Sequence, residues 1–411
     1  MRIKKLIKIL LFMISIVSCV PTSNSNITSP KPSPIINTNA TPTLVGIIST
    51  PTVTTSKYEN TKRNEGSLNR PVDQVLPYQD VRYLDLRKYG PLNASLIETL
   101  WFNQNTIWLP RDSEIAKEIL ELGKNPGFGI RSLHDQGFTG KGVIVAIIDQ
   151  EVNIDHAEFQ GKIARYVDNE AGQPLVAGSM HGPAVISLLV DDNIGTAPDA
   201  KVYYVAVPSW TGDAKYYAEA LDWIIEQNKK LPEGEKIRAV SVSAALSGIW
   251  SDFSKNKDLW DAAFNKATET GVLVLDCSYE EGITLPCTYD LHNPDDVSEC
   301  LPNYLGTPNS PHQRLFIPTS RTTAFEDGEK GSIYGYQFTG MGGISWTIPY
   351  LTGVLAMGWQ INPNLSNSQI IELLYDSAYK TDEGLLIINP PAFITSIKNT
   401  TIASEIYAHS K

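Results

Sequence analysis

Three residues of this 411-residue chain have the types and the setting that nucleophilic catalysis requires. Asp149 directly follows an apolar run, and His181 comes 32 residues later beside a glycine. Ser345 lies a further 164 residues on, shortly after two glycines and directly before a tryptophan. A serine hydroxyl is a weak nucleophile until a base removes its proton, and an imidazole held by a carboxylate is such a base. These residues could therefore transfer an acyl group through Ser345 if the fold brings them together.

The elements that must position these residues alternate between strands and helices. Residues 143–148 form an unbroken apolar run that ends at Asp149, which is typical of a strand buried on both faces. Such alternation predicts an α/β fold with a doubly wound parallel sheet and flanking helices, in which reactive groups lie at the carboxyl ends of strands. Further strands are predicted at 202–207, 239–243 and 272–275, and helices at 216–229, 259–270 and 366–374.

Three segments occur in the order and with the flanking residues of the subtilisin-like serine peptidases (subtilases), which they resemble. Residues 133–149 are similar to the family's entry into its first catalytic strand. Residues 181–187 (HGPAVIS) are similar to its histidine motif, and residues 342–353 (GGISWTIPYLTG) to its nucleophile motif. The resemblance extends over about 125–395, and it implies a subtilisin-like fold.

The resemblance implies a function as well as a fold. Asp149, His181 and Ser345 would form the catalytic triad of a serine endopeptidase, in the chain order that subtilisin has. His156 is the nearest rival base, but its position in the family belongs to a loop after the strand. Peptide or protein substrates would bind as an extended strand beside a cleft lined by three residues, Ser243, Ala244 and Ala245.

One motif departs from the family at the oxyanion site. Glu280 stands where the family has an asparagine that donates a hydrogen bond to the oxyanion, and losing such a donor typically costs about 10²–10³ in turnover. Burial could keep Glu280 protonated, so that it donates as the asparagine does. Alternatively Ser278 or a backbone amide near Ser345 supplies the donor, or peptidase activity is lost.

The cysteines predict no metal site. Cys277, Cys287 and Cys300 follow one another at intervals of 10 and 13, which match no zinc ligand pattern, and no cofactor is expected. In an exported protein Cys287 and Cys300 could form a disulfide, and three free thiols are the alternative.

The N-terminal region has the composition of an exported and anchored protein. Residues 1–18 are a basic stretch followed by a short apolar run, and with Cys19 they resemble a bacterial lipoprotein signal, which implies acylation of Cys19. Residues 19–70 are rich in Pro, Ser, Thr and Asn, so a flexible tether is predicted there. Residues 71–125 are predicted to form an N-terminal extension packed on the peptidase domain, which spans 126–400.

The charge and the departures from the family limit the partners and leave a second function open. The formal net charge of −11 argues against nucleic acid and anionic lipid as partners, so the membrane contact would be made by acylated Cys19. The chain is expected to be a monomer held on the outer side of the cell membrane. The alternative function is a catalytically silent subtilase that binds peptides at the cell surface.

Overall fold

The computed structural model describes residues 74–169, 180–248, 251, 253–278, 282–302, 313–327 and 333–409, which lie in a unit spanning Arg70–Lys411. Four of the expected features lie outside the described residues: the signal peptide (1–18), Cys19, the tether (19–70) and Glu280. The described residues belong to one compact unit, so the predicted boundary between the extension (71–125) and the peptidase domain (126–400) stays a prediction.

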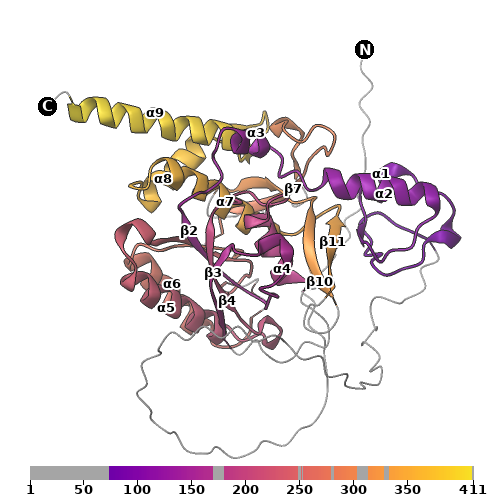
Figure 1. The fold of residues 1–411 in the computed structure, drawn as a ribbon, viewed down its shortest axis with the longest axis horizontal. Helices are drawn as coiled ribbons and strands as arrows, with labels where there is room; N and C mark the ends of the chain where they lie inside the picture. The colour runs from indigo at the N-terminus through magenta and orange to yellow at the C-terminus, as the bar shows by residue number, and fades with distance from the viewer. Residues whose placement is uncertain are drawn as a thin grey trace, which may run out of the picture. The chain divides into compact units, whose positions relative to one another are not determined.

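A five-stranded parallel sheet forms the centre of the fold, in the order β3-β4-β2-β5-β6 (Figure 1). Because all five strands run the same way, their carboxyl ends meet at one edge of the sheet, as the sequence predicted. The strands are β2 (Ile144–Asp149), β3 (Ile163–Asp168), β4 (Lys201–Ala206), β5 (Ile237–Val242) and β6 (Leu273–Asp276).

Helices cover both faces of this sheet, which confirms the doubly wound α/β fold. Alternate residues of β2 point to opposite sides, so that Val145 and Ile147 belong to one hydrophobic cluster while Ala146 and Ile148 belong to the other. The first cluster includes helices α4 (His181–Val190) and α7 (Ile344–Ile361), and the second includes α5 (Lys215–Lys230) and α6 (Lys257–Glu269).

The helix that the sequence placed at 366–374 is α8 (Asn367–Asp376), and its capping box is confirmed. The Ser366 hydroxyl accepts from the Gln369 backbone amide, and the Gln369 side chain accepts from the Ser366 amide, so two N-terminal donors of the helix are satisfied. Helix α9 (Pro390–His409) contacts both α8 and the short helix α3 (Ile130–Asp135).

Two smaller sheets flank the central one, and the sequence did not predict them. One has the order β12-β13-β9-β7-β8 and the other the order β1-β11-β10. Their strands are β1 (Trp101–Asn103), β7 (Thr284–Thr288), β8 (Leu301–Pro302), β9 (Leu315–Pro318), β10 (Thr322–Asp327), β11 (Ile333–Thr339), β12 (Tyr379–Lys380) and β13 (Leu386–Ile387).

The described part of the N-terminal extension is folded against the rest of the unit. It contains α1 (Ala94–Ile97), β1 and α2 (Pro110–Leu122), and β1 pairs antiparallel with β11. Phe102 of β1 is 1% exposed and its ring lies 5.5 Å from that of Phe338 on β11. The extension therefore shares a hydrophobic core with the remainder of the unit.

The three cysteines divide into one pair and one free thiol. Cys287 of β7 and Cys300 form a disulfide, with their Cα atoms 5.6 Å apart, which decides against three free thiols. Cys277 is free and buried. Among the described helices, none combines the length and the apolar character that crossing a lipid bilayer would need.

Candidate active site

The carboxylate and the imidazole meet at the carboxyl edge of the central sheet. Asp149 is the last residue of β2, and His181 is the first residue of α4. Asp149 Oδ1 and His181 Nδ1 lie 2.7 Å apart, within hydrogen-bonding distance, so the strand end and the helix start place the two side chains as a catalytic pair requires. With Nδ1 bonded to Asp149, Nε2 is the nitrogen left to accept a proton from a nucleophile.

The environment of this pair favours a charged imidazole. The Asp149 side chain is 3% exposed and that of His181 is 23% exposed. Burial alone would lower the pKa of His181, but the charge of Asp149 and its hydrogen bond to Nδ1 outweigh burial and raise that pKa above its ordinary value. The pair is therefore suited to hold the proton that a serine nucleophile gives up.

Ser345 lies in the first turn of α7, an 18-residue helix that is buried over most of its length. Gly343 is the N-cap of this helix, and Gly342 has a φ of +65°, a left-handed conformation that favours glycine. The backbone amides at the start of a helix lack partners within the helix, and the helix dipole favours negative charge there. A negative charge that develops at Ser345 would therefore be stabilised by this helix terminus.

The Ser345 hydroxyl is directed at β5 and β6. It donates to the Ser243 carbonyl at 3.3 Å, while the Ser243 hydroxyl donates to the Ser345 carbonyl at 2.8 Å. The Ser345 hydroxyl also forms a hydrogen bond with the thiol of Cys277. Among the described residues, the Ser345 hydroxyl therefore bonds to Ser243 and Cys277 and not to His181, so Ser345 and His181 must come within hydrogen-bonding distance before a proton can be transferred.

The predicted substrate-lining residues follow directly after β5. The Ser243 side chain is buried and contacts Ser345. The Ala244 carbonyl accepts from the Cys277 amide at 3.1 Å, and the Ala245 carbonyl accepts from the Ser251 hydroxyl at 2.7 Å. Ser243 is thus the one of the three that is shown in contact with the nucleophile, and substrate binding by all three stays a prediction.

The oxyanion donors predicted from sequence are placed only in part. Ser278 is fully buried, and its hydroxyl donates to Asp276 Oδ2 at 2.7 Å while its amide donates to Asp276 Oδ1 at 3.0 Å. Its hydroxyl hydrogen is therefore already used, which leaves the backbone amides near Ser345 as the donors that the fold makes available. Glu280 lies outside the described residues.

Two residues to which the sequence assigned no part in the catalytic site lie beside the catalytic groups. Burial, together with Asp276 and Asp149, raises the pKa of the Cys277 thiol well above its ordinary value, so Cys277 meets Ser345 as a neutral thiol. The Trp346 ring lies 5.5 Å from the His181 ring. The sequence could have predicted that Cys277 lies at the site, because it directly follows a strand that pairs with β5. It could have predicted the same for Trp346, because that residue directly follows Ser345.

His156 occupies a structural position. It is 1% exposed, and its ring lies 4.5 Å from that of Phe159 and 4.3 Å from that of Tyr334. Its Nδ1 accepts from the Glu158 amide at 3.2 Å, so one ring nitrogen caps the short helix that follows. These contacts agree with setting His156 aside as a rival base.

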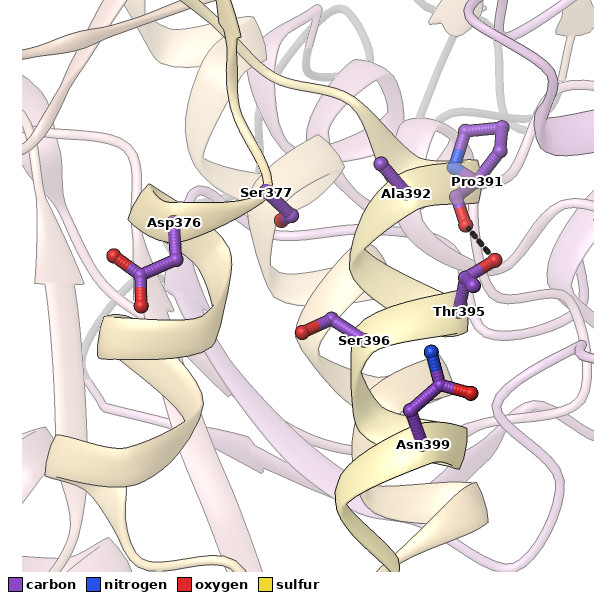
Figure 2. A pocket seen from close by; sticks show the side chains of 7 residues that line it. All are labelled: Asp376, Ser377, Pro391, Ala392, Thr395, Ser396 and Asn399. Atoms are coloured by element: carbon purple, nitrogen blue, oxygen red, sulfur yellow. Dashed lines mark hydrogen bonds between the residues drawn. The ribbon is translucent and has the colours of Figure 1, made fainter.

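A pocket of about 460 Å³ lies between the end of α8 and the first turns of α9 (Figure 2). Its lining contains neither histidine nor cysteine, and none of the three catalytic candidates contributes to it. The Thr395 hydroxyl donates to the Pro391 carbonyl within α9 (Figure 2).

Comparison with known families supports this assignment of chemistry. Residues 140–301 match the sequence model of the subtilase family. The matched segment includes Asp149 and His181 and ends before Ser345. The match agrees with the subtilisin-like α/β architecture of the sheet and its helices.

The chain is similar at low identity to curated subtilisin-like proteases, and it has weak matches among solved structures. The chain is 24% identical to subtilisin E of Bacillus subtilis (strain 168) over 262 residues, which is 60% of this chain and 63% of that protein. It is 27% identical to M-protease of Shouchella clausii (strain KSM-K16) over 303 residues, or 70% and 72% of the two chains. The crystal structure of fervidolysin from Fervidobacterium pennivorans, a keratinolytic enzyme related to subtilisin, has a TM-score of 0.47 at 17% identity and covers 65% of this chain and 44% of that one. The match to subtilisin E thus spans less than two thirds of that protein's length.

Proposed function

We propose that this chain is a subtilase, a serine endopeptidase that hydrolyses peptide bonds through an acyl-enzyme on Ser345. The observation that carries the proposal is the 2.7 Å contact between Asp149 Oδ1 and His181 Nδ1 at the carboxyl edge of the parallel sheet. Ser345 at the start of a buried helix and the family match over residues 140–301 support it.

The residues would divide the reaction into acylation and deacylation. In acylation, Ser345 Oγ forms a bond to the peptide carbonyl carbon while His181 Nε2 takes the hydroxyl proton. The carbon–nitrogen bond then breaks, and His181 gives the proton to the departing amine. In deacylation, the water oxygen forms a bond to the ester carbon while His181 takes a proton from the water. The bond between that carbon and Ser345 Oγ then breaks, the carboxylic acid product leaves, and His181 returns the proton to Ser345. Asp149 stabilises the imidazolium in both halves.

The negative oxygen of the tetrahedral intermediate needs donors fixed in advance. The backbone amides in the first turn of α7 are the groups beside Ser345 that can donate to it. A protonated Glu280 would add a second donor, whereas an ionised one would repel the oxygen. The rate at which the enzyme works therefore depends on the protonation of Glu280.

The place of the enzyme would be the outer side of a membrane. Export through residues 1–18 and acylation of Cys19 would anchor the chain, and residues 19–70 would separate the peptidase from the lipid. Incorporation of a labelled fatty acid into the wild-type chain, and its loss in Cys19→Ser, is the expected result in growing cells. Equal incorporation in both chains would remove Cys19 as the anchor.

A catalytically silent peptide-binding module is the second candidate, and one observation favours it. The Ser345 hydroxyl bonds to the Ser243 carbonyl instead of His181, so the base and the nucleophile are not yet joined. If this arrangement persisted with substrate bound, Ser345 would keep its proton, and the protein would bind peptides without cutting them.

Reaction with a fluorophosphonate probe separates these two functions, since the probe forms a covalent bond only with an activated serine. We expect the wild-type chain to be labelled, and Ser345→Ala and His181→Ala to lose labelling by about 10³-fold or more. Ser368→Ala and His292→Ala remove the same side chains from exposed positions and are expected to keep the wild-type rate.

The controls also define the opposite result. A folded wild-type chain that stays unlabelled from acid to alkaline pH would overturn the peptidase proposal, and binding of peptides by that chain would then support the silent module. Labelling that survives in Ser345→Ala would place the nucleophile elsewhere.

A further inference from the structure

The N-terminal extension makes direct contact with the turn that leads to Ser345. This turn, residues 340–343, connects the end of β11 to the start of α7. We propose that the extension, residues 74–122, is a positioning element of the active site, which holds this turn and through it the nucleophile. The inference rests on the proposed function of Ser345, and it assigns to the extension a role beyond packing.

Backbone pairing brings the extension to the turn. β1 pairs with the last residues of β11, with Trp101 opposite Thr339 and Phe102 opposite Phe338. The ladder continues past the strand end, where the Gly340 amide donates to the Leu100 carbonyl at 3.0 Å. Because Gly340 is the first residue of the turn, the extension fixes the point from which the chain departs towards Ser345.

The contact at Gly340 is too close for any side chain. A Cβ atom at Gly340 would lie 2.3 Å from the Glu98 carbonyl oxygen and 2.5 Å from Thr99 Cα, and both of those are backbone atoms. Backbone cannot move aside as the end of a flexible side chain can. The extension and the turn therefore fit together as one packed unit.

The other side of the turn is held by the segment after β9. The Thr319 hydroxyl donates to the Met341 carbonyl at 2.9 Å, and a Cβ atom at Gly342 would lie 2.0 Å from the Thr319 carbonyl oxygen. The extension therefore holds the turn on one side and Thr319 holds it on the other. Losing either contact would allow the turn to shift.

Side chains of the extension reinforce the pairing along β11. Gln337 Oε1 accepts from Trp101 Nε1 at 3.3 Å and from Arg82 Nη1 at 3.3 Å, and Gln337 Nε2 donates to Thr323 at 3.2 Å. The Arg82 guanidinium also lies 3.6 Å from the centre of the Trp101 ring. Gln337 thereby joins the extension, β11 and β10, so β11 is held along its length and not only at its end.

Pushing the turn away from the extension should slow acylation, because the nucleophile moves with the turn. Gly340→Ala is expected to lower the probe-labelling rate by about 10–100-fold, since a displacement of about 1 Å at a catalytic group costs on that order. Gly234→Ala is the matched control, because no atom lies within 4 Å of the added Cβ there. It is expected to label at the wild-type rate.

A second pair of variants loosens the extension while leaving the turn itself unchanged. Phe102→Leu weakens β1 against β11, and Phe393→Leu removes a similarly buried ring from α9, where it packs against Gly358 in the far half of α7. We expect both to lower the unfolding temperature, and only Phe102→Leu to slow labelling. A purely structural role for the extension would make the two variants label alike.

Hydrogen exchange of residues 333–346 decides the inference independently of activity. We expect the amides of the turn to exchange faster in Phe102→Leu than in Phe393→Leu when both are measured well below their unfolding midpoints. If labelling and exchange are the same in the two variants, the inference is overturned, even where the wild type is labelled. If the wild type is not labelled, the proposed function fails while the exchange rates still decide whether the extension holds the turn.

Discussion

Asp149→Asn is expected to lower the turnover of a peptide substrate by about 10⁴-fold while leaving the fold intact. An amide can donate to His181 Nδ1 and so favour the tautomer in which Nε2 carries the hydrogen and cannot accept the proton of Ser345. The 2.7 Å contact to Nδ1 is the one that the change alters. Turnover of a chromogenic peptide, with the unfolding temperature measured alongside, checks the result.

The same variant should change the pH dependence of whatever activity remains. Activity falls as pH falls through the pKa of His181, because a protonated imidazole cannot act as a base. Asp149 raises that pKa, so removing its charge should move the acid limb of kcat/KM to lower pH. Asp382→Asn alters an exposed carboxylate and should keep the wild-type profile. Full activity in Asp149→Asn would show that Asp149 is not the residue that orients His181 for catalysis.

Glu326→Gln is expected to stabilise the protein at alkaline pH. Glu326 lies on β10, is 5% exposed and accepts from the Asn153 amide at 2.9 Å. Burial, with a further contribution from Glu151, raises the pKa of Glu326 to about 8, although the Asn153 hydrogen bond acts in the opposite direction. A glutamine has the shape of the protonated acid and keeps an oxygen for the Asn153 amide, but it never acquires a charge.

The raised pKa determines the direction of the pH effect. Between pH 4.5, which is the ordinary pKa of a glutamate, and about pH 8, Glu326 is protonated in the folded state but not in the unfolded state. The stability that this protonated group contributes is therefore present at low pH and is lost as the pH rises. At about pH 9 the free energy of unfolding of the variant should therefore exceed that of the wild type by on the order of 5 kcal/mol, and at about pH 4 the two should agree.

Urea unfolding at both pH values measures this difference. Asp191 also has a pKa raised to about 8, chiefly by burial, and it loses stability in the same window. The comparison must therefore be between variant and wild type at each pH, and not between pH values. Glu372→Gln changes an exposed glutamate and should show no such difference. A Glu326→Gln chain that is less stable than wild type at both pH values would show that Glu326 is ionised in the fold.

The parts of the fold that the sequence predicted are those with a strong local pattern. β2 begins one residue after the predicted run and ends at Asp149, and α8 carries its predicted capping box. Long apolar runs and a capping box act within a few residues, so they can be recognised without the rest of the chain.

The two outer sheets depend on partners far along the chain. β8, β12 and β13 have two residues each, which is too short for a periodic pattern. Their pairing depends on the surface that the rest of the molecule presents, and that surface is not encoded next to them in the sequence.

The residues of the candidate site also differ in how far the sequence could predict them. The positions of Asp149 and His181 follow from a strand end and a helix start, and both were predicted. The direction of the Ser345 hydroxyl was not, because it depends on χ1 and on Ser243 and Cys277 as competing partners. Side-chain rotamers depend on tertiary neighbours, so a motif predicts where a nucleophile lies but not where it points.

The pairing of β1 with β11 has a consequence for the time at which the active site is completed. Trp101 of β1 and Gln337 of β11 are 236 residues apart in sequence. During synthesis β1 is therefore made long before β11, and the two strands can pair only when most of the chain is present. Contacts between such distant segments form slowly, because the intervening chain must first be ordered. The turn before Ser345 would therefore be ordered among the last parts of the molecule, and a peptidase built in this way would acquire its activity after its own unfolded segments have been buried.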